Sequence, residues 1–137
     1  MEKKTYVTTP RLVMGCGTFA QAGEEMGRLG ASRVFVLTGG HAVREGKAGA
    51  LEKALRDRGM ESALFDGIEP DPSCDTLERA LEAARKFGAD AVVGLGGGSP
   101  LDMAKAVSVL LTNEGPLRSF FGVDLLYRRG LPKLLIP

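Results

Sequence analysis

The sequence predicts an α/β fold, a doubly wound and mostly parallel Rossmann-like sheet with helices on both faces. Short apolar runs rich in Val, Leu and Ile alternate along the chain with longer segments of helical periodicity. The connections between them are short, which favours right-handed β–α–β crossovers and therefore parallel strands. A chain of 137 residues is long enough for one domain with its own core, so residues 1–137 are assigned to a single domain.

Composition and charge exclude several classes of protein. Lys and Arg number 18 and Asp and Glu 17, a net charge of +1, which gives no support for a nucleic-acid or membrane partner. The two cysteines are far apart and predict free thiols in a reducing compartment. The polar N-terminus lacks the apolar stretch of a signal peptide, and no segment reaches the roughly 20 apolar residues of a membrane span. We therefore expect a cytoplasmic protein.

The first half of the chain predicts four elements after an N-terminal β-hairpin. The hairpin would comprise two short strands within residues 5–14, broken by Thr9-Pro10. A helix is predicted over 17–31, a strand buried on both faces over 33–38, a helix over 46–59 and a strand over 61–66. The first helix has its apolar stripe at Phe19, Ala22, Met26 and Leu29, and the second at Ala48, Leu51 and Leu55.

The second half continues the alternation. A loop over 67–73 is stiffened by two prolines, and Ser73 then caps an amphipathic helix that runs to Gly88. A strand over 89–95 leads into a helix over 99–112, and the apolar segment 131–137 begins another buried strand. A doubly wound domain rarely ends on a central strand, so we expect this chain to be the leading piece of something longer.

A first glycine-rich stretch, Gly15 to Ala20, matches the pattern G-x-G-x-x-[GA]. The dinucleotide fingerprint also needs an acidic residue at the end of the second strand, about 20 residues on. That strand ends at Thr38, and the nearest downstream acid is Glu45. A tight turn into a helix is therefore favoured over phosphate contact.

A second glycine-rich stretch, VVGLGGGSPLD, runs from Val92 to Asp102. Ser99 as N-cap, Pro100 at the first helical position and Asp102 at the third would form a capping box. The three glycines Gly96, Gly97 and Gly98 are not explained by that box, because one glycine suffices for a turn. Residues without side chains before a helix N-terminus let a large anion approach the backbone N–H groups. The stretch therefore predicts a phosphate site, and it is not a P-loop, because no Lys-Ser or Lys-Thr pair follows the last glycine.

Other polar candidates are weaker. His41, the only histidine, is interpreted as an exposed loop residue, although it could touch a ligand near Gly39-Gly40. The segment EPDPS over 69–73 follows a strand end, where both a rigid turn and a lip of the ligand cleft remain open readings. No His, Asp or Glu set has catalytic-metal spacing, and no nucleophile–base pair stands out.

On these residues the sequence resembles the N-terminal domain of the iron-containing (group III) alcohol dehydrogenases. The resemblance rests on GLGGGSPLDMAKAV over 94–107, supported by GCGTF, RVFVLTGG, FDGIEPDPS and LPKLLIP. It implies an NAD- or NADP-binding domain of an enzyme that acts on an alcohol or aldehyde, forms a homodimer, and rests the pyrophosphate on the loop from Gly96 to Pro100. It also implies a helical C-terminal domain with one Asp and three His ligands for Fe²⁺ or Zn²⁺. That domain has no counterpart in this sequence, so the fragment alone should be inactive.

Two positions depart from the family pattern. Members that prefer NAD tend to carry Asp at the position of Gly39, where a carboxylate repels a 2′-phosphate, so Gly39 predicts that NADP(H) is tolerated or even preferred. The alternative is that Gly39 only makes the turn. Asp71 stands where the family more often has Asn, and an acid there could offset part of that effect. The predicted cofactor site comprises Gly39, Asp71, Gly96, Gly97, Gly98, Ser99, Pro100 and Asp102, with no catalytic or metal residue in this chain. A stand-alone nucleotide-binding module and the related glycerol dehydrogenase and dehydroquinate synthase branches remain the alternatives.

Overall fold

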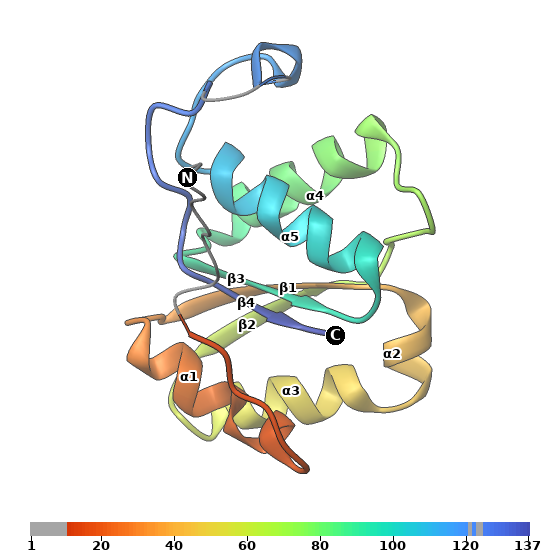
Figure 1. The fold of residues 1–137 in the computed structure, drawn as a ribbon, viewed down its shortest axis with the longest axis vertical. Helices are drawn as coiled ribbons and strands as arrows, with labels where there is room; N and C mark the ends of the chain where they lie inside the picture. The colour runs from red at the N-terminus through yellow and green to blue at the C-terminus, as the bar shows by residue number, and fades with distance from the viewer. Residues whose placement is uncertain (1–10, 121, 123–124) are drawn as a thin grey trace, which may run out of the picture.

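A computed structural model describes residues 11–120, 122 and 125–137. A four-stranded sheet forms the middle of three layers, with helices packed on both of its faces (Figure 1). This arrangement confirms the predicted α/β class and its doubly wound, parallel sheet.

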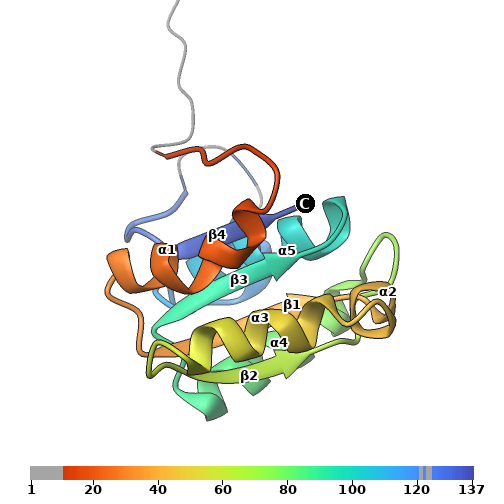
Figure 2. The same ribbon diagram turned by 90° about the horizontal axis from the view of Figure 1, so that it is seen from below.

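The sheet is built from β1 (Arg33–Thr38), β2 (Glu61–Phe65), β3 (Ala91–Leu95) and β4 (Lys133–Ile136). All neighbouring strands are parallel, and their order across the sheet is β2-β1-β3-β4 (Figure 2). The chain therefore leaves β1 toward one edge of the sheet and returns to place β3 on the other side of β1. That reversal makes the carboxyl ends of β1 and β3 the topological switch point, where doubly wound domains bind their ligands.

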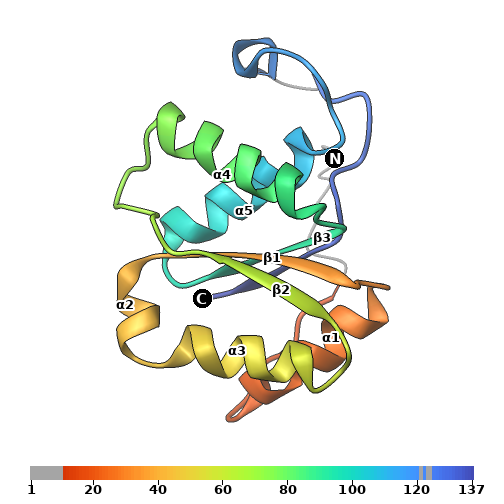
Figure 3. The same ribbon diagram turned by 180° about the vertical axis from the view of Figure 1, so that it is seen from behind.

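The helices divide between the two faces of the sheet. On one face lie the short 3₁₀ turn η1 (Thr18–Gln21), α1 (Ala22–Arg28) and α3 (Lys47–Arg56), and on the other lie α4 (Cys74–Phe87) and α5 (Gly98–Leu110) (Figure 3). The one-turn helix α2 (Gly40–Arg44) sits at the carboxyl edge directly after β1, and a second 3₁₀ turn, η2 (Leu117–Phe120), follows α5. Among the described residues no helix has both the length and the apolar character that crossing a membrane requires.

The core has two halves, one on each side of the sheet. Val34 and Val36 of β1 point toward α1 and α3, whereas Phe35 and Leu37 point toward α4 and α5. All four side chains are buried, which confirms that the strand at 33–38 is covered on both faces. The predicted apolar stripe of α3 is buried as well, and Ser73 caps α4 by accepting a hydrogen bond from the Thr76 N–H at 3.1 Å.

Four expectations about local structure need correction. The helix predicted over 17–31 splits into η1 and α1, because Gly17 adopts a left-handed conformation (φ 77°) and starts a 3₁₀ turn. Leu29 is the C-cap of α1 rather than part of its buried stripe and is 44 % exposed. β4 is only half-buried because it is the outer strand of the described sheet. The helix α2 was not predicted at all.

The predicted N-terminal hairpin falls mostly on residues 5–10, which lie outside the described part of the chain. Its second half does not form a strand: residues 11–14 have no strand neighbour in the described sheet, and Leu12 and Met14 are 73 % and 80 % exposed.

Candidate functional site

A hollow of about 440 Å³ opens at the carboxyl edge of the sheet, over the switch point between β1 and β3. Two turns form its opposite walls: the β1–α2 turn with Gly39 and Gly40, and the β3–α5 turn with Gly96, Gly97 and Gly98. The loop after β2 contributes Ile68, Glu69 and Pro70. The strand order thus brings together three loops that are far apart in the sequence, and we call this feature the carboxyl-edge hollow.

The β3–α5 turn presents an uncapped helix N-terminus to the hollow. Helix α5 begins at Gly98, with Gly97 as its N-cap in an extended conformation (φ −68°, ψ −168°), and no side chain caps it. Among the described residues, the N–H groups of Gly97, Gly98 and Ser99 donate no hydrogen bond. Three backbone donors and the positive end of a 13-residue helix therefore face the hollow together.

The predicted capping box is wrong. Helical hydrogen bonding starts earlier, with Leu101 N–H donating to Gly97 O at 3.4 Å, so Ser99 and Pro100 are the second and third helical residues. Pro100 is tolerated there because the N–H it lacks would have had no helical partner in the first turn. Asp102 instead pairs with Lys105 at 2.9 Å, is mostly exposed and does not line the hollow. The helix end is consequently more open than the sequence suggested.

The glycines of this turn serve three different purposes. A Cβ at Gly94 would come within 2.9 Å of both Ala104 Cβ and Pro100 O, so this glycine lets α5 pack closely on β3. Gly96 has φ 123°, a conformation that only glycine adopts readily, and its N–H donates to Ile136 O at 2.9 Å. A Cβ at Gly97 or Gly98 would meet nothing within 4 Å. Neither packing nor conformation requires these last two glycines, and their empty Cβ positions leave the helix end accessible.

The β1–α2 turn forms the facing wall. Thr38 is buried, and its hydroxyl donates to Leu95 O at 2.7 Å, which ties the ends of β1 and β3 together. Gly39 is extended (φ −100°, ψ 165°), so its backbone conformation does not demand glycine. A Cβ at this position would lie 3.0 Å from Ile68 O, closer than most Cβ contacts. Gly39 is therefore favoured by its close approach to the loop after β2 rather than by the turn itself.

Charged side chains line the rim of the hollow. The Glu45 carboxylate lies 2.8 Å from Lys47 Nζ and 3.1 Å from His41 Nε2, and the hydrogen bond from Lys47 lowers the pKa of Glu45. Glu69 accepts hydrogen bonds from the Thr76 hydroxyl at 2.6 Å and from the Ser73 N–H at 3.3 Å, which lower the pKa of Glu69. Both carboxylates are thus held ionised and engaged by neighbours on α2, α3 and α4.

Six of the eight predicted cofactor residues line the hollow: Gly39, Gly96, Gly97, Gly98, Ser99 and Pro100. Asp71 does not; it is exposed, with a positive φ of 51°. The residues that sequence reasoning missed are chiefly those of α2 and its flank, Arg44, Glu45 and Lys47. Their sequence spacing could have predicted this: Arg44 and Glu45 follow His41 by three and four residues, and residues so spaced share one side of a helix. His41 also lines the hollow; it is exposed as predicted, but it lies in α2 rather than in a loop.

The first glycine stretch lies elsewhere. Gly15 and Gly17 both have positive φ, 148° and 77°, and neither lines the hollow. The Thr18 hydroxyl and N–H both donate to Gly15 O, at 3.0 and 3.4 Å, so the turn closes on itself. These contacts fit the predicted structural turn.

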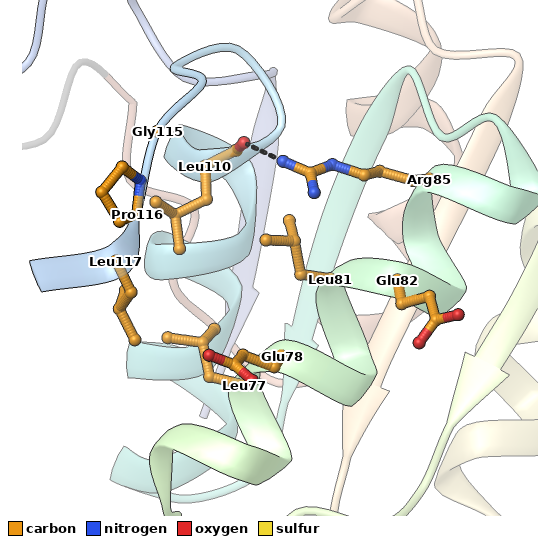
Figure 4. A pocket seen from close by; sticks show the side chains of 9 residues that line it. All are labelled: Leu77, Glu78, Leu81, Glu82, Arg85, Leu110, Gly115, Pro116 and Leu117. Atoms are coloured by element: carbon orange, nitrogen blue, oxygen red, sulfur yellow. Dashed lines mark hydrogen bonds between the residues drawn. The ribbon is translucent and has the colours of Figure 1, made fainter.

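A second hollow of about 300 Å³ lies between α4, the end of α5 and residues 115–117. Four of its nine lining residues are leucines, and Arg85 extends across to donate to Leu110 O at 3.3 Å while Glu82 points away from that contact (Figure 4). Its polar groups do not converge, which makes it the weaker candidate for a small-molecule site. In the described ranges no group of three or more His, Cys, Asp or Glu side chains is placed to hold a metal ion.

Fold and hollow together define a doubly wound α/β domain with an anion-accessible turn at its switch point. Residues 9–137 match the family model described as iron-containing alcohol dehydrogenase, and the chain belongs to that family. It is 39 % identical over 132 residues to a sulfoacetaldehyde reductase of Bilophila wadsworthia and 35 % identical over 134 residues to long-chain-alcohol dehydrogenase 1 of Geobacillus thermodenitrificans.

Both alignments cover 96 % of this chain and 34 % of the relative, so the chain spans about a third of the length of these curated relatives. The crystal structure of an NADH-dependent butanol dehydrogenase from Thermotoga maritima superimposes with a TM-score of 0.89. It is 31 % identical, and the match covers 98 % of this chain and 34 % of that one.

Proposed function

We propose that residues 1–137 are the NAD(P)-binding domain of a metal-dependent alcohol dehydrogenase or aldehyde reductase. The observation that carries this proposal is the uncapped N-terminus of α5 with open space beside Gly97 and Gly98, placed at the switch point of the sheet. Membership of the iron-containing alcohol dehydrogenase family supports it. An NADH-dependent relative with the same fold supports a nicotinamide dinucleotide as the ligand.

The residues of the β3–α5 turn would hold the dinucleotide through its pyrophosphate. The N–H groups of Gly97, Gly98 and Ser99 would donate to phosphate oxygens, and the α5 dipole favours the negative charge. The Thr38–Leu95 hydrogen bond keeps the two walls of the hollow at a constant separation. When bound, the nicotinamide supplies the hydride-transfer chemistry of the enzyme. This chain contributes binding and orientation, and we assign it no proton-transfer residue.

The metal would be held outside these residues. No metal cluster exists among the side chains that the structure places, and the one histidine, His41, contacts Glu45 at the surface. The Fe²⁺ or Zn²⁺ implied by the family would therefore take its ligands from another part of the protein. In the same proposal the protein acts on a small alcohol or aldehyde, forms a homodimer and works in the cytoplasm.

Gly39 bears on the choice of cofactor. A carboxylate at this wall would accept hydrogen bonds from the 2′-hydroxyl of NAD and repel the 2′-phosphate of NADP. Gly39 offers neither effect, so NADP(H) is accepted alongside NAD(H). The exposed Asp71 does not reach the hollow and so would not oppose the 2′-phosphate there.

Titration of the protein expressed from its complete gene with NADH and NADPH tests the proposal. We expect a rise in nicotinamide fluorescence on binding, with ADP competing at least about tenfold better than adenosine, because only ADP carries the pyrophosphate that the helix end would hold. Absence of binding by either reduced cofactor, or equal competition by ADP and adenosine, would refute it.

A further inference from the structure

Arg44, the last residue of α2, places a positive charge on the rim of the carboxyl-edge hollow. Among the described residues, no carboxylate oxygen lies within 4.0 Å of its guanidinium. Lys47 and His41, the other basic residues of the rim, both contact Glu45. Arg44 is thus the cation of this rim whose hydrogen-bond donors are uncommitted.

The backbone of the β1–α2 turn allows Arg44 to fold back over it. A Cβ at Gly40 would stand 3.2 Å from Arg44 Nη1, so the guanidinium occupies the space that a side chain at residue 40 would enter. Gly39, immediately before it, has no side chain on the wall facing the β3–α5 turn. The paired glycines therefore place a planar, permanently charged group at the end of β1, across the hollow from the open helix N-terminus.

Neither acid of the rim forms an ion pair with Arg44. Glu69 is engaged by the Thr76 hydroxyl and the Ser73 N–H on the α4 side of the loop, and Glu45 is engaged by Lys47 and His41. A guanidinium matches the geometry of a phosphate through two parallel N–H···O bonds, which an ammonium cannot form. A second phosphate, separate from the pyrophosphate, would meet a preformed partner here.

We propose that Arg44 determines cofactor specificity by binding the 2′-phosphate of NADP(H), in a position that Gly39 and Gly40 leave open. This inference rests on the proposed function, because it assumes that a dinucleotide occupies the hollow. It goes further by naming the side chain that distinguishes the two cofactors and by predicting that NADP(H) binds more tightly than NAD(H).

The test compares NADPH and NADH affinities of the complete protein with those of R44Q. Loss of a charge-assisted bidentate contact should weaken NADPH binding about 10- to 100-fold and leave NADH binding within about twofold. R44K, which keeps the charge and loses the fork, should fall between wild type and R44Q. R56Q is the matched control. Arg56 also ends a helix, α3, but does not line the hollow, and its substitution removes the same charge as R44Q does.

Gly40→Ala provides a second, geometric test. The added Cβ would stand 3.2 Å from Arg44 Nη1 and push the guanidinium aside by a few tenths of an ångström without changing any charge, so the ratio of NADPH to NADH affinity should fall, by less than in R44Q. If both cofactors bind and R44Q leaves their ratio unchanged, the role of Arg44 is wrong and the proposed function stands. If neither cofactor binds to the wild type, the proposed function and the role of Arg44 fall together.

Discussion

The turn at 15–17 and the β3–α5 turn both place glycines before a helix, and of these two only the β3–α5 turn lines the carboxyl-edge hollow. In the turn at 15–17, both glycines have positive φ and Thr18 closes the turn onto Gly15 O. In the β3–α5 turn, Gly97 and Gly98 do not adopt the left-handed conformation, and the adjacent N–H groups have no acceptor among the described residues. In these two turns, the glycines required by φ build a closed turn, whereas Gly97 and Gly98, which neither φ nor packing requires, leave a helix end accessible.

The largest effect is expected at Gly94, the glycine that lets α5 pack closely on β3. A valine there would meet Ala104 Cβ and the backbone of Pro100 and Leu101, none of which can swing aside. We expect Gly94→Val to lower the free energy of unfolding by about 3 kcal/mol or to prevent folding, measured by chemical denaturation. Gly49→Val is the control, because a Cβ at this exposed position of α3 meets nothing within 4 Å. Equal stability of the two variants would contradict the packing role.

Gly97→Val should separate binding from folding. Its φ of −68° and extended ψ suit a branched residue, and its Cβ meets nothing, so the helical circular dichroism and the unfolding midpoint should match those of wild type. The valine would cover the helix end, and we expect NADH and NADPH affinities to drop at least about 100-fold because the pyrophosphate donors become inaccessible. Unchanged affinity in the folded variant would move the dinucleotide away from α5.

Much of the fold could be predicted because burial on both faces leaves a strong signal. The run at 33–38 reads as a central strand since each of its faces packs against helices, and the stripes of α3 and α4 emerge from spacing alone. Leu29 was misjudged because periodicity does not reveal where a helix ends, and a glycine one residue later ends this one. The five-residue helix α2 offers too few turns for any periodic pattern.

The candidate site was only partly predictable. The glycine run located the turn, but Ser99-Pro100-x-Asp102 also fits a capping box, and only the structure shows that the helix starts at Gly98. The opposite wall depends on the order of the strands, which places β1 next to β3 although 52 residues separate Thr38 from Ala91 in the chain. Arg44 belongs to the rim only because of that strand order and because it ends the short helix α2.

Gly39 tests whether the β1–α2 wall chooses between cofactors. Gly39→Asp should weaken NADPH binding relative to NADH at least about tenfold, because the carboxylate repels a 2′-phosphate. Gly39→Asn has nearly the same shape without the charge and controls for the close approach to Ile68 O, which must yield in both variants. Fluorescence titrations with both cofactors give the ratio. An equal shift in both variants would show that crowding, not charge, acts here.

The turn at 15–17 provides the reverse of the Gly97 experiment. Gly17 lies at φ 77°, and a Cβ there meets nothing, so Gly17→Ala should cost about 1 kcal/mol of unfolding free energy through backbone strain alone. Cofactor affinity should remain within about twofold, since the turn does not line the hollow. Denaturation and titration of the same preparation measure both quantities. A loss of binding without a loss of stability would assign this turn to the cofactor after all.

The smallest effect concerns the ion pair between Arg11, in the segment before that turn, and Glu25 of α1. Arg11 binds the Glu25 carboxylate of α1 through Nε at 2.6 Å and Nη2 at 2.9 Å, and this hydrogen bonding lowers the pKa of Glu25. A lowered folded-state pKa stabilises the fold at pH values above the ordinary glutamate pKa of about 4.3, and the contribution disappears as pH falls through the lower, folded value. The thermal midpoint should therefore fall on acidification in wild type and less steeply in Glu25→Gln, which starts lower at neutral pH. In Gly97→Val the thermal midpoint should depend on pH as it does in wild type. Gly97 lines the carboxyl-edge hollow, whereas Glu25 lies on α1. A Glu25→Gln profile that parallels wild type would show that the ion pairs of Glu25 with Arg11 and Arg28 do not stabilise the fold.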